Sequence, residues 1–221
     1  MPDVWTAVQD LDRATQERLA DVLEKRGADA QQHAMRRAFL QEVRFPQDAR
    51  VLDVGCGTGV LTRVLARWPA VRSVIGVDPA PALLEKARVA AADLPNVSFQ
   101  EGDGRSLPFD GEMFDVVTSD SMLSHVPGPE RAIGEAFRVL RAGGCLAVFD
   151  GDYATTTVAL ADHDVGLADH GQVVDARGHP PEHHRPTLDL RRPPAGAVEA
   201  GPDELRSGQC RVVVTVAFHT F

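Results

Sequence analysis

The sequence predicts an α/β fold, namely a doubly wound and mostly parallel sheet whose C-terminal strands are atypical or incomplete. Between residues 50 and 149, short runs of β-branched residues alternate with segments in which apolar residues recur at helical spacing. This alternation is typical of βαβ units. Glycines directly follow the first run, as they do where the carboxyl end of a parallel strand approaches a ligand. The chain of 221 residues is long enough for one packed domain.

The first predicted element is helical. From Leu11 to Val43 the apolar residues form a stripe at helical spacing, with a break at Gly27, and Pro46 ends the segment. We therefore expect residues 1–46 to form a helical segment that precedes the sheet.

Five strands follow, with helices between them. The predicted strands are residues 50–54, 73–77, 97–100, 114–118 and 145–149. One helix begins at Val60 and ends before Pro69, and the next is opened by Pro81, whose missing N–H would have no partner in a first turn anyway. A further helix, before the fifth strand, is predicted to end at Gly143–Gly144.

The rest of the chain has a different composition. No Phe, Trp, Ile or Met occurs between Asp150 and Ala217, whereas six prolines and five of the eight histidines fall between Ala161 and Pro202. Such a stretch can bury little apolar surface, which favours loops or disorder. Residues 161–221 are therefore expected to be an atypical Pro/His-rich region with one further strand over Arg211–Phe218. A shift of the coding frame near residues 164–166 is an alternative explanation.

Composition disfavours several classes of partner. The formal charge of −9 argues against nucleic acid, because phosphates bind clustered Lys and Arg. No run approaches the roughly 20 apolar residues of a membrane span, and the N-terminus lacks the order of a signal peptide, so we expect a cytoplasmic protein without a membrane span. The three cysteines lack a CxxC motif and the histidines lack an H-x₃-H spacing, so no metal site is expected.

The most informative segment runs from Val51 to Gly59 (VLDVGCGTG), where a buried-strand pattern leads into glycines and then into a helix. Asp78 ends the second strand, where a carboxylate can accept hydrogen bonds from two ribose hydroxyls; it can also cap the next helix. No P-loop Lys follows the glycines, which favours a nucleoside with an amino-acid tail over a nucleotide. The G-x-G-x-G spacing differs from the dinucleotide fingerprint G-x-G-x-x-G, so an NAD(P)-dependent oxidoreductase is the weaker alternative.

These motifs resemble the class I S-adenosylmethionine-dependent methyltransferases, in particular the small-molecule group that includes the ubiquinone and menaquinone C-methyltransferases. The resemblance covers residues 50–152 and rests on VLDVGCGTG, Gly76–Pro79, Gly102–Gly104, a fourth-strand region and the turn RVLRAGG. It implies a Rossmann-like fold and S-adenosyl-L-methionine as the cofactor. The residues that it assigns to the cofactor site are Asp53, Gly55, Cys56, Gly57, Gly59, Asp78, Pro79, Asp103, Gly104, Ser119 and Asp120.

The resemblance also implies a role for each carboxylate. Asp53 lies near the methionine portion of the cofactor, Asp78 binds the ribose, and Asp103 reaches the adenine amino group. Ser119 or Asp120 closes the site.

The resemblance further suggests a division of the chain. In this family an N-terminal helical segment commonly covers the acceptor pocket, so residues 1–46 are expected to act as a lid, although Met35 and Phe39 can equally be core residues. Residues 47–160 are expected to be the cofactor-binding α/β domain, followed by the atypical region 161–221.

His125 is the candidate general base, because it follows the fourth strand at the expected pocket mouth and histidine titrates near neutral pH. A structural or cofactor-proximal histidine is the alternative. Asp150, Asp152 and Tyr153, at the end of the fifth strand, are alternative residues for orienting the acceptor. Cys56 is expected to pack within the turn and not to act as a nucleophile.

The predicted function is methyl transfer from S-adenosylmethionine to a small-molecule acceptor of apolar or aromatic character. A protein that binds the cofactor without catalysis, for example because its C-terminus is truncated or frame-shifted, is the alternative. The acceptor atom and the oligomeric state do not follow from the sequence.

Overall fold

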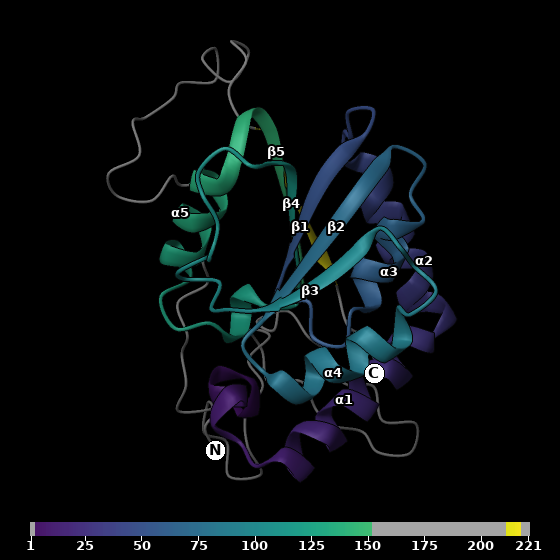
Figure 1. Cartoon of the computed structure of the whole chain (residues 1–221), viewed down its shortest axis with the longest axis vertical. Coiled ribbons are helices and arrows are strands. Elements are labelled where there is room, and N and C mark those ends of the chain that lie inside the picture. The colour runs from purple at the N-terminus through teal and green to yellow at the C-terminus, as the bar shows by residue number, and fades with distance from the viewer. Residues whose placement is uncertain (1–2, 152–210, 218–221) are drawn as a thin grey trace, which may run out of the picture.

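Six parallel strands form one sheet in the order β3-β2-β1-β4-β5-β6. The computed structural model describes residues 3–151 and 211–217 (Figure 1). The strands are β1 (Ala49–Val54), β2 (Val71–Asp78), β3 (Val97–Glu101), β4 (Phe114–Asp120), β5 (Leu140–Gly151) and β6 (Arg211–Ala217). The helices are α1 (Arg13–Ala28), α2 (Ala30–Glu42), α3 (Val60–Ala66), α4 (Pro81–Ala90) and α5 (Pro129–Val139), with 3-10 turns η1 (Val4–Asp10) and η2 (Leu123–His125).

Both faces of the sheet are covered, with α2 and α3 on one face and α5 on the other (Figure 1). Successive strand residues point to opposite faces. In β1, Val51 packs with Phe39 and Leu65 of the first face, whereas Leu52 packs with Ala136 of the second. Continuous apolar runs are thus required in the central strands, as expected of a buried parallel sheet.

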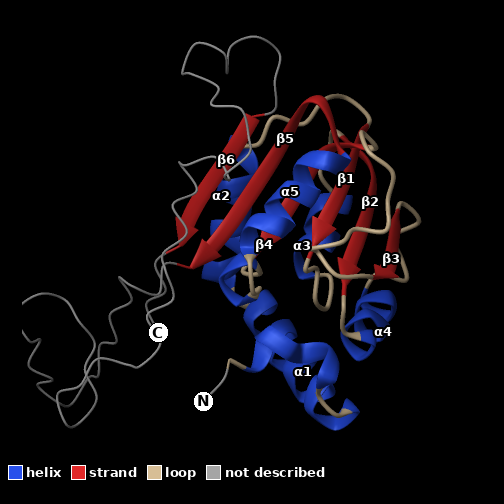
Figure 2. Cartoon of the chain, turned by 90° about the vertical axis from the view of Figure 1, so that its left-hand side faces the viewer, coloured by secondary structure: helices blue, strands red, loops and turns tan. Residues whose placement is uncertain are grey.

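A third apolar cluster lies at the carboxyl edge of the sheet, where α1 extends beyond the arrowheads of the strands (Figure 2). Val8 of η1, Ala20 of α1 and Leu83 of α4 form its buried part. Gln16 ties these elements together: its amide Nε2 donates to the Val8 carbonyl at 3.0 Å, and its Oε1 accepts the Ala82 N–H at 3.3 Å. The N-terminal elements are therefore fixed beside the strand ends.

The predicted α/β class and the predicted strands are confirmed, including the further strand near the C-terminus, which forms β6 and pairs parallel to β5. The predicted helix end at Gly143–Gly144 is wrong, because α5 ends at Val139 and Leu140 already pairs with Phe114. Residues 141–144 form an irregularity within β5.

The break in the N-terminal helices lies two residues after the predicted Gly27, at Asp29, whose side chain accepts the Gln32 N–H and caps α2. The turn η1 was not predicted. The expectations for residues 161–210 and the coding-frame alternative concern residues that lie outside the described part of the chain. No helix in the described ranges combines the length and apolarity that crossing a membrane requires.

Candidate active site

A cavity of about 150 Å³ lies at the carboxyl ends of the central strands, and Trp5, Val8 and Leu23 of the N-terminal elements line it too. Its position is the one at which doubly wound sheets bind ligands. Ten of the residues predicted from the sequence line it. They are Asp53, Gly55, Cys56, Gly57, Asp78, Pro79, Asp103, Gly104, Asp120 and His125.

The glycine turn after β1 forms part of the cavity wall. Gly55 has φ +72°, and a Cβ at this position would lie 2.4 Å from Cγ of Met122. The N–H groups of Gly55 and Cys56 donate to the carbonyl of Val77, at 2.8 and 3.0 Å. The turn is thus bonded to the end of β2, and only glycine allows Met122 to lie so close to its backbone.

Asp53 lies buried beneath this turn and joins three elements. Its Oδ2 accepts the hydroxyl of Thr62 in α3 at 2.6 Å, and its Oδ1 accepts the hydroxyl of Thr118 in β4 at 2.9 Å. Burial raises the pKa of Asp53 to about 7, against the lowering effect of these two hydrogen bonds. Asp53 therefore holds the turn in place and carries a proton that is exchangeable near neutral pH.

Asp78 fixes the other side of the turn. Its two oxygens accept the backbone N–H groups of Ala80 and Gly57, each at 2.9 Å. Burial raises the pKa of Asp78 to about 6, although both hydrogen bonds lower it. Ala80, and not Asp78, is the N-cap residue of α4. Each carboxylate oxygen retains acceptor capacity for a further donor.

Asp103 is the most exposed of these carboxylates, with its side chain 45% exposed. The guanidinium of Arg105 donates to both of its oxygens, at distances down to 2.6 Å, and lowers the pKa of Asp103. Asp103 is thus ionised at neutral pH and held in one orientation.

A buried ion pair lies at the β4 side of the cavity. Nε of Arg36, from α2, donates to Oδ2 of Asp120 at 2.5 Å, and the Arg36 side chain is only 7% exposed. The other oxygen of Asp120 accepts the Ser121 hydroxyl at 2.9 Å. Nη1 of Arg36 is buried and has no hydrogen-bond partner among the described residues.

His125 lies at the opening of the cavity with the N-terminal turn. Its Nδ1 is 2.5 Å from Oδ2 of Asp3, and its ring centroid is 6.3 Å from that of Trp5. The other oxygen of Asp3 accepts the Trp5 N–H at 3.0 Å, so the same carboxylate starts η1 and contacts the imidazole. Within the described residues, no group of three or more His, Cys, Asp and Glu side chains is arranged to hold a metal ion.

Residues 52–148 match the family described as methyltransferase domain. The chain contains a class I methyltransferase domain. The resemblance predicted from the sequence is thereby confirmed, and methyltransferases of this fold generally use S-adenosylmethionine.

The domain is similar to small-molecule methyltransferases. Over 100 residues it is 41% identical to 2-methyl-6-phytyl-1,4-hydroquinone methyltransferase 2, chloroplastic, of Oryza sativa subsp. japonica, covering 45% of this chain and 28% of that protein. Over 126 residues it is 34% identical to 2-phytyl-1,4-naphtoquinone methyltransferase of Thermosynechococcus vestitus, covering 57% and 56%. The chain thus spans from about a quarter to little more than half of the length of these relatives.

The fold of the methyltransferase domain is shared with a solved SAM-dependent methyltransferase from Aquifex aeolicus. The two chains are 19% identical with a TM-score of 0.53, and the match covers 65% of this chain and 74% of the other. At this identity the likeness concerns the fold alone.

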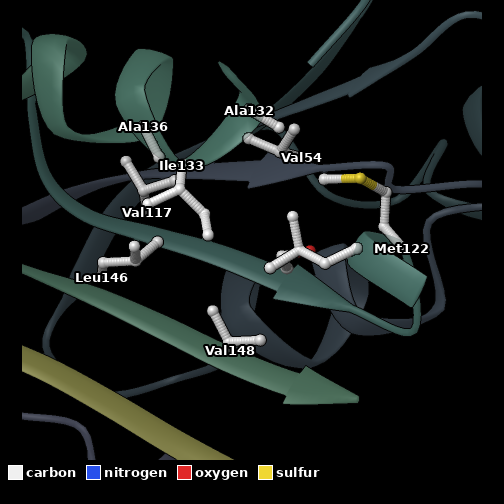
Figure 3. A pocket seen from close by; sticks show the side chains of 10 residues that line it. Val54, Val117, Met122, Ala132, Ile133, Ala136, Leu146 and Val148 are labelled. Atoms are coloured by element: carbon white, nitrogen blue, oxygen red, sulfur yellow. The ribbon is translucent and has the colours of Figure 1, made fainter. Parts of the chain in front are cut away.

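Two of the predicted site residues of the methyltransferase domain do not line the main cavity. Gly59, at φ +75°, precedes α3, and a Cβ there would lie 2.8 Å from Cζ of Phe99. Ser119 lines a separate cavity of about 10 Å³, roughly the space of one water molecule. In that cavity Val54 and Val117 of the sheet face Ile133 of α5 (Figure 3).

Ser119 therefore lies between the sheet and α5 and not in the main cavity. Its buried hydroxyl has no partner among the described residues. Burial also raises the pKa of the Cys56 thiol well above its ordinary value, which leaves it protonated, as expected of a packing residue.

Asp150, an alternative for orienting the acceptor, accepts both the N–H and the hydroxyl of Ser124, at 3.2 and 2.9 Å. Asp152 and Tyr153 lie outside the described residues.

Sequence reasoning missed several residues that line the cavity. Trp5 and Val8 come from the unpredicted turn η1, and Arg36 comes from α2. The sequence could have indicated that Arg36 is buried, because it precedes Phe39 and Leu40 by three and four positions and therefore lies on the same apolar face of the helix. Phe39 and Leu40 themselves pack in the core against the sheet.

Proposed function

We propose that the chain transfers a methyl group from S-adenosylmethionine to a small acceptor of apolar or aromatic character. The observation that carries this proposal is the row of carboxylates around one cavity of a methyltransferase domain. Asp103 follows β3, Asp78 and Asp120 end β2 and β4, and the glycine turn follows β1 between them.

The residues of the cavity fit this cofactor. Asp78 is already held by two backbone N–H groups and can accept hydrogen bonds from ribose hydroxyls. The ionised Asp103 can accept a hydrogen bond from the adenine amino group. Thr58 also lines the cavity, and its buried hydroxyl lacks a partner among the described residues.

When bound, S-adenosylmethionine supplies a methyl group that its sulfonium already activates. The chain therefore has to orient the acceptor and exclude water more than to supply covalent chemistry. His125 is positioned to receive a proton from an acceptor hydroxyl, and Asp3 holds the imidazole through Nδ1. Asp53 remains beneath the turn and supports it.

The apolar character of the acceptor is inferred from the cavity wall. Trp5, Val8, Leu23, Met122 and Val126 line the cavity, and such side chains favour an apolar or aromatic ligand. Relatives whose names specify phytyl-substituted quinols and naphthoquinones agree with this choice.

Calorimetric titration with S-adenosylhomocysteine and with NADH tests the cofactor. We expect binding of the first alone, and binding of NADH alone would refute the proposal in favour of an oxidoreductase. Incubation with S-adenosylmethionine and a panel of hydroquinones and phenols then tests catalysis through release of S-adenosylhomocysteine. Tight binding without turnover on any member would support a catalytically silent protein.

The role of His125 is tested by the variant His125→Gln. We expect turnover to fall by at least 100-fold, while S-adenosylhomocysteine still binds. His33→Gln, at an exposed position of α2, is the matched control. Turnover in His125→Gln equal to that of the control would show that the histidine does not act as the base.

A further inference from the structure

One carboxylate of the N-terminal segment links two distant parts of the chain. Oδ1 of Asp3 accepts the backbone N–H of Trp5 at 3.0 Å and so caps η1. Oδ2 of Asp3 lies 2.5 Å from Nδ1 of His125, which is 122 positions further along the chain. The Asp3 and His125 side chains are only 25% and 20% exposed, so water has limited access to this contact. The two oxygens of Asp3 therefore bond to different elements, one to η1 and the other to η2.

The backbone around His125 is fixed from another direction. The N–H of His125 donates to the carbonyl of Met122 at 2.9 Å. The preceding residue, Ser124, donates its N–H and its hydroxyl to the carboxylate of Asp150 in β5, at 3.2 and 2.9 Å. Because these bonds hold the backbone of η2, the contact with Asp3 acts on the imidazole ring. It determines the rotation of the ring and which of its nitrogens carries a proton.

The chemistry of the two groups determines the tautomer. A carboxylate only accepts hydrogen bonds, so the proton of the contact belongs to Nδ1 of His125, and in a neutral imidazole the lone pair then lies on Nε2. His125 lines the main cavity together with Trp5, whose ring centroid lies 6.3 Å from that of the imidazole. A carboxylate in this position also stabilises the imidazolium that forms when Nε2 takes up a proton.

We propose that Asp3 is a positioning residue for methyl transfer, which keeps His125 in the Nδ1–H tautomer and leaves Nε2 to take the proton of an acceptor hydroxyl. The inference rests on the proposed function and deepens it. As the proton passes to Nε2, the acceptor oxygen forms its bond to the methyl carbon, and the electron pair of the breaking carbon–sulfur bond stays on sulfur. The imidazolium then releases the proton to water. Because the same carboxylate caps η1, the base is set only when η1 is formed.

The variant Asp3→Asn separates this role from the capping of η1, because asparagine is as good an N-cap residue as aspartate. The Trp5 N–H requires the single oxygen of the new amide, so its NH₂ group faces Nδ1 of His125. This group can only donate, which moves the ring proton to Nε2. Turnover of a panel of phenols and hydroquinones should fall roughly 100-fold or more. The KM for the acceptor and the affinity for S-adenosylhomocysteine should stay within about threefold of the wild type.

Asp12→Asn is the matched control. Asp12 caps α1 by accepting the Thr15 N–H at 3.0 Å, at an exposed position. The substitution is thus the same exchange at the N-cap of the neighbouring helix, and it should leave turnover unchanged.

The tautomer is measured without cofactor or acceptor, by nitrogen-15 NMR of the histidine rings of the full chain at about pH 9. Protonated and unprotonated ring nitrogens have well-separated chemical shifts, and the signals of His125 are those that disappear in His125→Gln. We expect the proton on Nδ1 in the wild type and in Asp12→Asn, and on Nε2 in Asp3→Asn. A purely structural role of Asp3 would not move this proton.

Other outcomes overturn the inference. A proton on Nε2 in the wild type, or the same tautomer in the wild type and Asp3→Asn, would show that Asp3 does not set the base. Equal turnover in Asp3→Asn and Asp12→Asn would show the same; if His125→Gln still loses turnover, the proposed function stands and only the role of Asp3 fails. If the wild type neither binds S-adenosylhomocysteine nor releases it with any acceptor, the proposed function fails, and the role of Asp3 in transfer fails with it.

Discussion

The protonation of Asp53 leads to a quantitative prediction about stability. In the folded chain its pKa is about 7, compared with 3.8 for an exposed aspartate. The native state therefore binds the proton more tightly than the unfolded state. The resulting stabilisation is complete below pH 3.8 and is lost as the pH rises through 7.

The magnitude follows from these two values. Their difference of about three pH units corresponds to about 4 kcal/mol in total. Between pH 5 and pH 8 about 2 to 3 kcal/mol of this is lost, because the unfolded carboxyl is already ionised at pH 5. The nearly isosteric Asp53→Asn cannot ionise and lacks this dependence.

Urea unfolding followed by circular dichroism at pH 5, 6, 7 and 8 measures the effect. We expect the wild type to lose about 2 to 3 kcal/mol more than Asp53→Asn over this range, while the contribution of Asp78 is common to both proteins and cancels. Asp93→Asn, with its side chain 69% exposed, should parallel the wild type. Parallel curves for the wild type and Asp53→Asn, within about 0.5 kcal/mol, would refute the reasoning.

Three further outcomes are expected. Phe39→Ala, at a position only 2% exposed, should lower the free energy of urea unfolding by about 3 to 5 kcal/mol; Val89→Ala, 77% exposed, should change it by under 0.5 kcal/mol, and similar losses would contradict the assigned core. Gly55→Ala should abolish calorimetric binding of S-adenosylhomocysteine, because its Cβ would lie 2.4 Å from Met122; wild-type affinity would contradict the tight approach. Asp78→Asn should weaken that binding at least tenfold, and wild-type affinity should fall as the pH drops below about 6, where Asp78 becomes protonated; a flat pH profile would argue against a ribose contact.

Much of the fold could be predicted because the central strands are buried on both faces. Their continuous apolar runs, ended by Gly or Asp, mark each strand without reference to the rest of the chain. The end of α5 could not be read in this way. Leu140 continues the helical spacing of Ala136 and Phe137, and only its pairing with Phe114 assigns it to β5.

The site was predictable where it depends on strand ends and not where it depends on distant contacts. Asp53 and Asp78 are placed by the strands that precede them. Arg36 is buried in an ion pair with Asp120, which is 84 positions away in the sequence. From its neighbours in the sequence alone, an arginine in a helix is expected to lie in solvent. Gly59 matches the motif, but the structure places it against Phe99 and not in the cavity.

The bonds of Gln16 imply that the shape of the cavity depends on a residue outside its wall. Gln16 does not line the cavity, yet its amide joins the carbonyl of Val8 to the N–H of Ala82. Trp5 and Val8 form part of the wall around the opening. Substituting Gln16 would therefore free η1 from α4 and change the shape of the cavity while every residue of its wall stays the same.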